Sequence, residues 1–295
     1  MSKTKGILTI MLAAIIYGFT PILGKLTYIE GSNTLSLTFY RSFLSLPILY
    51  LILKVKHVSL KVTKQEFAKL SFLGILGPSL TALMLYGAYN YISVGMTTTI
   101  HYIYPVLVTA VCIIFFKEKI SKEKIIAVIL STIGICLFFE GDLSENLIGI
   151  LLALFSGFSY GAHILFIDKS GIKGMYPIKF SFYSCLASSI FLFFFGIATK
   201  TLVFEMSVIG WLYTILVSIL VSVIANSLMP IGIKHVGSTV TSIVGMFEPI
   251  TSVIMGILFL SEPFTFKNMI GSTFIIIAVL TLTLAKEENV ENIIK

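Results

Sequence analysis

The sequence predicts an all-α integral membrane protein with ten transmembrane helices in two inverted five-helix repeats. Three observations lead to this fold class. The 295 residues are 57% hydrophobic and 12% charged, whereas soluble domains carry about 25% charged residues. The apolar residues form runs of roughly 20, long enough for a helix to cross a bilayer, where a β-barrel would show alternating segments of about ten. A proline-centred pattern occurs twice, with Pro105 and Pro249 separated by 144 positions.

Ten apolar runs, separated by short polar connections, mark the expected helices. Ten spans in a chain of this length leave roughly 30 residues for each helix and its loop, which suits a bilayer crossing of about 20 residues. The expected spans are residues 7–24, 35–53, 69–90, 95–116, 124–140, 147–167, 178–198, 208–231, 238–260 and 268–285.

The distribution of basic residues predicts the orientation. Cytoplasmic loops of membrane proteins are enriched in Lys and Arg. If the N-terminus lies in the cytoplasm, 17 of the 21 Lys and Arg fall in cytoplasmic segments and three on the outer side, while Arg41 lies within a span. We therefore expect a multi-pass protein of the cytoplasmic membrane with both termini cytoplasmic. The net charge of +7 does not predict nucleic-acid binding, because these lysines lie in short connections between apolar runs.

The two halves match in several places. Each half has five spans, an odd number, so the second half is expected to insert upside down relative to the first. Tyr17-Gly18 and Tyr160-Gly161 occupy equivalent places, and Glu118 and Glu262 are separated by the same 144 positions as the two prolines. We expect repeats at residues 1–143 and 144–287 and a cytoplasmic tail at 288–295. Inverted repeats with broken helices are typical of alternating-access transporters. A duplication without a transport role is the alternative.

The chain resembles the EamA-type transporters of the drug/metabolite transporter superfamily, over about residues 5–285. The residues that carry the resemblance are Lys25, Arg41, the pattern Pro105…Glu118 and the pattern Glu248-Pro249…Glu262. The Trp-Gly that is usual in the first span is Tyr17-Gly18 here. The resemblance implies a transporter and no enzyme, with a central cavity lined mainly by spans 1, 3, 4, 6, 8 and 9. It also implies movement of amino acids, related metabolites or drugs, often outward.

Glu248 is the sharpest candidate for a functional side chain. It lies near the middle of the ninth span, where a charged carboxylate costs at least about 2.5 kcal/mol. It therefore has to face a cavity, find a partner or carry a proton. Two interpretations remain open. Glu248 contacts a cationic substrate group or couples transport to protons, or it is a protonated carboxyl that stabilises the helix break at Pro249.

Further candidates are polar or aromatic. Arg41 could hold a substrate carboxylate, but its place in the outer third of span 2 favours a side chain that extends to the membrane surface. His101, Tyr104 and Tyr86 could surround an ammonium group by cation–π contact, or form part of an interfacial belt of the kind expected for Tyr89 and Tyr91. Asn226 could line a cavity or join two helices. The candidate set is completed by the matched residues Tyr17 and Tyr160 and by Pro105 and Pro249 as expected kinks.

A second class of function has one motif in its favour. Gly157-Phe158-Ser159-Tyr160-Gly161 fits G-x-S-x-G, and His163 follows four residues after Ser159. The nucleophile elbow with this pattern requires a strand, a sharp turn and a helix. Here the pattern lies inside a long apolar run, where Gly157 and Gly161 have the small-xxx-small spacing of close helix packing. An intramembrane hydrolase is therefore the weaker alternative.

The function predicted from the sequence is a secondary transporter that exports small polar metabolites, amino acids or related compounds, by alternating access. Uptake of a quaternary amine such as choline is the alternative within transport. The expected partners are a small-molecule substrate and the lipid bilayer, with protons and a second copy of the chain left open and nucleic acid excluded. We expect no cofactor and no metal, because no phosphate-binding G-x-x-x-x-G-K-[ST] loop or metal-ligand pattern occurs.

Overall fold

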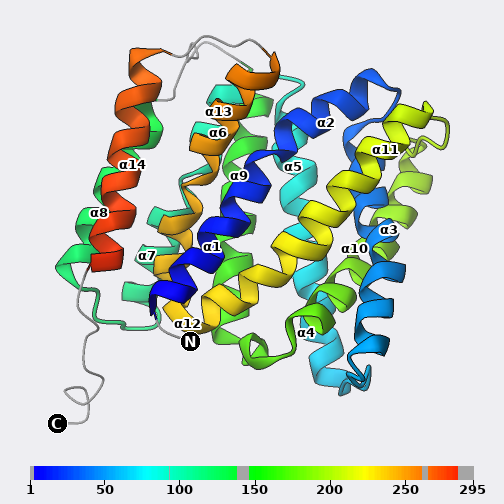
Figure 1. Cartoon of the computed structure of the whole chain (residues 1–295), viewed down its shortest axis with the longest axis horizontal. Helices are drawn as coiled ribbons and strands as arrows, with labels where there is room; N and C mark the ends of the chain where they lie inside the picture. The colour runs from blue at the N-terminus through cyan, green and yellow to red at the C-terminus, as the bar shows by residue number, and fades with distance from the viewer. Residues whose placement is uncertain (1–2, 93, 138–145, 261–264, 285–295) are drawn as a thin grey trace.

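The computed structural model of the chain describes residues 3–92, 94–137, 146–260 and 265–284, and these contain helices and no strand. The helices run between two ends of the molecule, with the N-terminus at the lower end in Figure 1. The helices are α1 (Lys3–Gly18), α2 (Thr20–Ile29), α3 (Thr34–Val55), α4 (Lys64–Gly74), η1 (Ile75–Thr81), α5 (Ala82–Ala88), α6 (Val94–His101), α7 (Tyr104–Ile114), α8 (Lys122–Leu137), α9 (Leu147–Lys169), η2 (Ile172–Gly174), α10 (Pro177–Thr199), α11 (Val208–Val217), η3 (Ser218–Ala225), α12 (Asn226–Gly245), α13 (Glu248–Leu260) and α14 (Phe266–Leu284).

Eight helical segments of the described residues are long and apolar enough to cross a membrane, against ten expected. One difference is Val208–Met255, a 48-residue segment that includes two expected spans. At 1.5 Å per residue it would extend about 72 Å, more than twice the roughly 30 Å hydrocarbon core. It turns at Gly237, whose φ of 77° and ψ of 172° lie outside the helical region and suit glycine. The other difference is α8, of which 16 residues are described.

The two prolines separate helices where the sequence predicts kinks. Pro105 is the second residue of α7, which begins after α6 has ended at His101. Pro249 is likewise the second residue of α13, after α12 has ended at Gly245. Proline suits the first turn of a helix, because the amide hydrogen that it lacks would have no helical partner there. Each proline therefore lies in the first turn of a new helix, and two residues in a turn precede each start.

Two π-helices occupy equivalent places in the two halves. The first, η1, is Ile75–Thr81 and the second, η3, is Ser218–Ala225, so they lie 143 to 144 residues apart. A π-helix joins backbone groups five residues apart instead of four. In η1 backbone carbonyls also accept hydrogen bonds from side chains, for instance Leu76 O from the hydroxyl of Thr81 (2.9 Å). Short π-helical segments occur frequently at functional sites.

Helices of the two halves pack against each other throughout the bundle. The pairs are α1 with α12, α3 with α10, and α8 with α14, and Figure 1 shows the last pair side by side at one edge of the molecule. Between α3 and α10 the hydroxyls of Ser42 and Ser188 are 3.2 Å apart. Small residues and hydroxyl pairs are the expected contacts between membrane helices, because lipid provides no hydrophobic driving force for their association.

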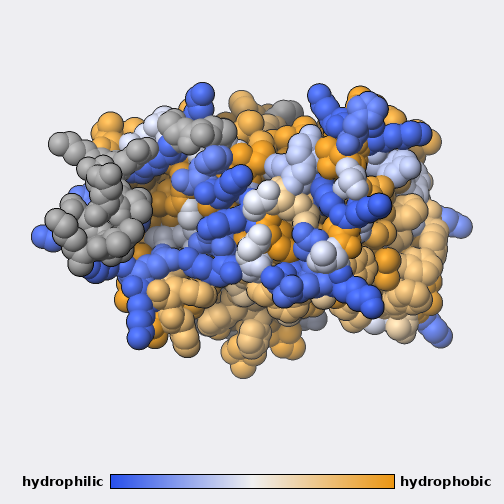
Figure 2. Space-filling view, turned by 90° about the horizontal axis from the view of Figure 1, so that it is seen from below, coloured by the Kyte–Doolittle hydropathy of each residue, from blue (hydrophilic) through white to orange (hydrophobic). Residues whose placement is uncertain are grey.

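The end of the molecule that carries the N-terminus is hydrophilic. Figure 2 shows hydrophilic residues gathered over this face, with apolar surface on its flanks. The connection from α3 to α4 lies at this end and begins α4 with a capping box, in which Thr63 and Glu66 satisfy each other's backbone amides (2.7 and 3.1 Å). This face is the one that the lysine distribution predicts to be cytoplasmic.

Candidate functional site

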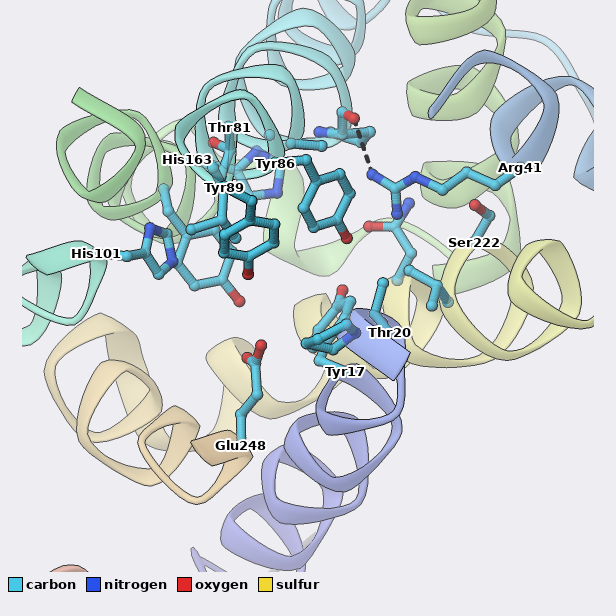
Figure 3. A pocket seen from close by; sticks show the side chains of 18 residues that line it. Tyr17, Thr20, Arg41, Thr81, Tyr86, Tyr89, His101, His163, Ser222 and Glu248 are labelled. Atoms are coloured by element: carbon cyan, nitrogen blue, oxygen red, sulfur yellow. Dashed lines mark hydrogen bonds between the residues drawn. The ribbon is translucent and has the colours of Figure 1, made fainter. Parts of the chain in front are cut away.

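A polar cavity lies where the broken helices of the two halves meet. Its cavity volume is about 90 Å³. Seven of the eight residues predicted to bind substrate line it. Figure 3 shows that labelled side chains enter it from several helices of the bundle. The seven predicted residues are Tyr17, Arg41, Tyr86, His101, Tyr160, Asn226 and Glu248.

The break between α12 and α13 positions Glu248. As the first residue of α13, it extends its carboxylate into the cavity, to which its side chain is partly exposed. Gly18 makes this possible, because a Cβ there would lie 2.8 Å from the Glu248 carbonyl oxygen and 2.5 Å from the Thr251 Cβ. The hydroxyl of Ser252 then donates a 3.1 Å hydrogen bond to the Gly18 carbonyl. The Tyr17-Gly18 pair thus packs on the helix start that carries Glu248.

The equivalent arrangement occurs in the other half. A Cβ at Gly161, on α9, would lie at ordinary contact distances of 3.6 and 3.7 Å from the Cβ and carbonyl oxygen of Tyr104 at the start of α7. Gly157 approaches the preceding turn even more closely, because a Cβ there would lie 2.6 Å from the His101 carbonyl oxygen. His101 itself is 6% exposed, and its Nδ1 lies 2.8 Å from the hydroxyl of Ser156. Helix α9 therefore holds the first break as α1 holds the second.

Arg41 does not extend to the membrane surface, which the sequence favoured. It is 7% exposed, and its Nη2 donates a 2.9 Å hydrogen bond to the Pro78 carbonyl of η1. Its own carbonyl accepts a 2.8 Å hydrogen bond from Ser218, the first residue of η3. Arg41 thus contacts the π-helices of both halves. The physical reason is that the Pro78 carbonyl of η1 accepts this hydrogen bond at depth, so the guanidinium finds a partner without reaching the interface.

Tyr104 lies behind the wall of the cavity. It is 1% exposed, and its ring packs edge-on against that of Tyr160, with centroids 4.8 Å apart and an interplanar angle of 88°. The His101 ring also contacts both tyrosines, with centroid distances of 5.5 and 5.6 Å. Tyr104 therefore supports the lining residues and does not face the cavity.

The lining residues that sequence reasoning did not predict as substrate-binding include Thr20, His163 and Tyr89. Thr20 and His163 are each 4% exposed, and Thr20 Oγ1 and His163 Nδ1 have no hydrogen-bond partner within the described residues. A signal was available, because Thr20 follows Tyr17 by the same three residues that separate His163 from Tyr160. Tyr89 was expected in the interfacial belt but lines the cavity instead, whereas Tyr91 is 46% exposed.

The G-x-S-x-G pattern does not form an elbow. Helix α9 continues without interruption from Leu147 to Lys169. The hydroxyl of Ser159 donates a 2.8 Å hydrogen bond to the Leu76 carbonyl of η1. The serine therefore joins two helices, and the strand and sharp turn of a nucleophile elbow are absent from this segment.

The two ends of the cavity region differ. At one end a smaller pocket shares Thr20 and Tyr86 with the cavity and reaches the exposed Lys25. At the other end lies a group of charged and polar residues that we term the Asp168 cluster. Its central member, Asp168, is 6% exposed. The cluster consists of Asp168, Lys169, Lys173, Glu118 and Ser238.

The Asp168 cluster joins four segments of the chain. Asp168 pairs with Lys173 (2.7 Å) and Lys169 (3.1 Å), and Lys169 also pairs with Glu118 beyond the end of α7. Asp168 Oδ2 accepts a 3.1 Å hydrogen bond from the hydroxyl of Ser238, directly after the turn at Gly237. Glu262, the residue equivalent to Glu118, lies outside the described residues.

Comparison with known proteins identifies the family. The model of the EamA-like transporter family matches residues 4–140 and 147–284. The chain belongs to the EamA-like transporter family. Membership agrees with the all-helical membrane fold and with a multi-pass transporter that contacts the lipid bilayer and a small-molecule substrate.

Relatives of this EamA-like protein carry transporter names. An uncharacterized transporter of Clostridium kluyveri is 28% identical, over 92% of this chain and 91% of that protein. An uncharacterized transporter of Archaeoglobus fulgidus is 26% identical, over 92% and 93%. UDP-galactose/UDP-glucose transporter 7 of Arabidopsis thaliana is 25% identical, over 57% and 55%. One crystal structure has the same fold, with a TM-score of 0.83 and 14% sequence identity. The match covers 96% of this chain and 99% of the chain in that structure.

Proposed function

We propose that the protein is a secondary transporter that moves small polar metabolites, amino acids or related compounds, outward across the cytoplasmic membrane by alternating access. The observation that carries the proposal is the cavity between the helix breaks, which contains both a carboxylate and a guanidinium. Discontinuous helices at a site between two repeats are typical of alternating-access transporters. Glu248 is the candidate for proton coupling, because it is partly exposed to this cavity.

The two ends of the cavity region support an outward-facing arrangement. The smaller pocket continues toward Lys25, on the side that the lysine distribution predicts to be external. The Asp168 cluster ties α9 to the turn at Gly237, within α12, on the predicted cytoplasmic side. In the proposed cycle this cluster separates when the cavity opens to the cytoplasm, and the helix starts at Pro105 and Pro249 serve as hinges.

Uptake of choline is a second candidate, because tyrosines and His101 surround the carboxylate of Glu248, as cation–π recognition requires. A nucleotide sugar, the substrate named for the Arabidopsis relative, fits less well, because its diphosphate would face the Glu248 carboxylate. A hydrolase has no support from Ser159, whose hydroxyl is engaged by the Leu76 carbonyl.

The test is uptake and counterflow in proteoliposomes with pooled labelled amino acids and with labelled choline. Wild type is compared with Glu248→Gln and with Glu123→Gln, a control at an exposed glutamate near the start of α8. We expect exchange of the amino-acid pool by wild type and the control and its loss in Glu248→Gln. Exchange of choline alone would replace the proposed substrate class, and failure to exchange any metabolite in a broad screen would refute the transporter itself.

A further inference from the structure

The cavity contains two opposite charges that do not pair with each other. Arg41 and Glu248 both line it, and Figure 3 shows them pointing into it from different sides. All three ion pairs in the described part of the chain belong to the Asp168 cluster. Within those residues, therefore, neither the guanidinium nor the carboxylate has a counter-ion. Charges inside a membrane protein are costly unless they are paired or hydrated.

Both groups keep capacity for a ligand. Arg41 uses its Nη2 on the Pro78 carbonyl, and its Nε has no partner among the described residues. The buried hydroxyl of Tyr102 lies near the Glu248 carboxylate. That hydroxyl makes no hydrogen bond of ordinary geometry within the described residues, so the carboxylate keeps its capacity to accept hydrogen bonds. Most buried polar groups in native proteins are satisfied. Because Arg41 and Glu248 line the same cavity, this cavity indicates where a ligand binds.

A hydroxyl lies on the Arg41 side of the cavity. Thr20 is 4% exposed, its Oγ1 has no partner in the described residues, and Figure 3 shows it and Ser222 on this side. A carboxylate accepts several hydrogen bonds and binds a guanidinium strongly, so Arg41 with Thr20 suits a carboxylate. The Glu248 side, with His101 and Tyr89 nearby in Figure 3, suits an ammonium group.

We propose that the cavity binds a zwitterion, with the carboxylate of the ligand at Arg41 and Thr20 and its ammonium group at Glu248. The inference rests on the proposed function, in which this cavity is the transport site. A simple amine such as choline would leave Arg41 without a counter-ion, and an anion such as a diphosphate would leave Glu248 facing like charge. A zwitterion compensates both charges and brings no net charge into the membrane.

The test measures ligand binding to the purified protein in detergent, as thermal stabilisation, independently of transport. The probes are ω-amino acids from glycine to 6-aminohexanoate, together with the alkylamine and the carboxylate of each length. In wild type we expect one or two adjacent lengths to bind at least about tenfold more tightly than either matched analogue, because each analogue loses one charge-assisted contact. The length that binds best reports the separation of the two charged groups.

Variants assign the two ends of the ligand. In Glu248→Gln the advantage of the zwitterion over its carboxylate analogue should disappear, and in Arg41→Gln its advantage over the amine should disappear. Arg41→Lys should restore part of the second advantage, while Glu123→Gln should behave as wild type. The melting temperature of each variant without ligand separates misfolding from loss of binding. If a variant does not fold, the comparison of zwitterions with their analogues on wild type still tests the proposal.

The outcomes separate this inference from the proposed function. Amines or carboxylates that bind wild type as well as the zwitterions do, or no binding by any probe, would overturn the zwitterion site. Counterflow of a singly charged substrate would in that case still support the proposed transport function. If the zwitterions bind with the expected charge dependence but nothing exchanges across proteoliposomes, the site stands and the proposed transport fails.

Discussion

Asp168→Asn should open the predicted cytoplasmic side of the protein. The substitution keeps the size of the side chain and one acceptor oxygen but removes the charge that holds Lys169 and Lys173. It also weakens the hydrogen bond from Ser238, the residue that follows the turn at Gly237. We expect the segments joined by the Asp168 cluster to separate more often, since Asp168 is the one residue that contacts both lysines and Ser238 directly.

The size of the effect follows from burial. The side chains of Lys169 and Lys173 are 26% and 41% exposed, whereas that of Asp168 is 4% exposed. Part-exposed ion pairs contribute about 0.5 kcal/mol each, and the weaker hydrogen bond to Ser238 adds a further half kcal/mol or so. The total of about 1.5 kcal/mol corresponds to roughly a tenfold increase in the open population. Glu118→Gln removes only the outer pair with Lys169 and should change that population by less than about threefold.

A native cysteine reports the opening. Cys112 is fully buried, and its sulfur lies 3.4 Å from the hydroxyl of Ser238. Its alkylation by a membrane-permeant maleimide, followed by peptide mass spectrometry, should become about tenfold faster in Asp168→Asn, because labelling requires local opening. Cys185, also buried, is the internal control and should keep its rate. An unchanged labelling rate at Cys112 would refute the reasoning, because the Asp168 cluster would then not hold this side closed. An equal rise in rate at Cys185 would also refute it, because the whole bundle would then have loosened.

Three further predictions concern packing and the cavity wall. Gly18→Ala should lower the melting temperature, because overpacking against α13 costs about 1–3 kcal/mol of stability. Gly24→Ala should leave it unchanged, because a Cβ there would lie 3.7 Å from its nearest contact; equal effects of the two substitutions would contradict the tight contact with α13. Ser159→Ala should keep transport within about twofold, because it loses one neutral hydrogen bond worth about 1 kcal/mol; complete loss of turnover in a folded variant would revive the hydrolase. Tyr104→Phe should leave the KM for transport within about twofold, since the ring contact with Tyr160 persists, and a large rise in KM would place Tyr104 in the substrate site after all.

The membrane fold could be predicted because its signals are local. Apolar runs, lysine-rich connections and the two prolines each follow from composition and spacing, and Glu248 is conspicuous as a carboxylate inside an apolar run. The same reasoning found seven residues that line the cavity. Tyr104 is 1% exposed and does not line the cavity, because helix rotation depends on packing against neighbours that the sequence does not specify.

Other features required tertiary contacts. The position of Arg41 depends on its hydrogen bond to the Pro78 carbonyl of η1, and π-helices have no simple sequence signature, so the sequence favoured the membrane surface for this side chain. The division of the chain at residue 143, the inverted insertion of the halves and the second crossing formed within Val208–Met255 remain predictions. Thr20 was missed because a threonine in an apolar run is ordinary. Its place three residues after Tyr17 and its hydroxyl, which has no partner within the described residues, set it apart.

The π-helices have a mechanical consequence. Over the same length of axis, a π-helix contains more residues than an α-helix. If η1 became α-helical, its extra residue would shift into the segment that follows. That segment would rotate by about 100°, because an α-helix has 3.6 residues per turn. Tyr86 would then swing around the axis of its helix while α4 stayed at its depth in the bilayer. Asn226 follows η3 in the same way. Each half of the chain thus contains a π-helix next to the cavity that allows the following helix to rotate about its axis. Cavity-lining side chains on that helix would change position without movement of the helix along the bilayer normal.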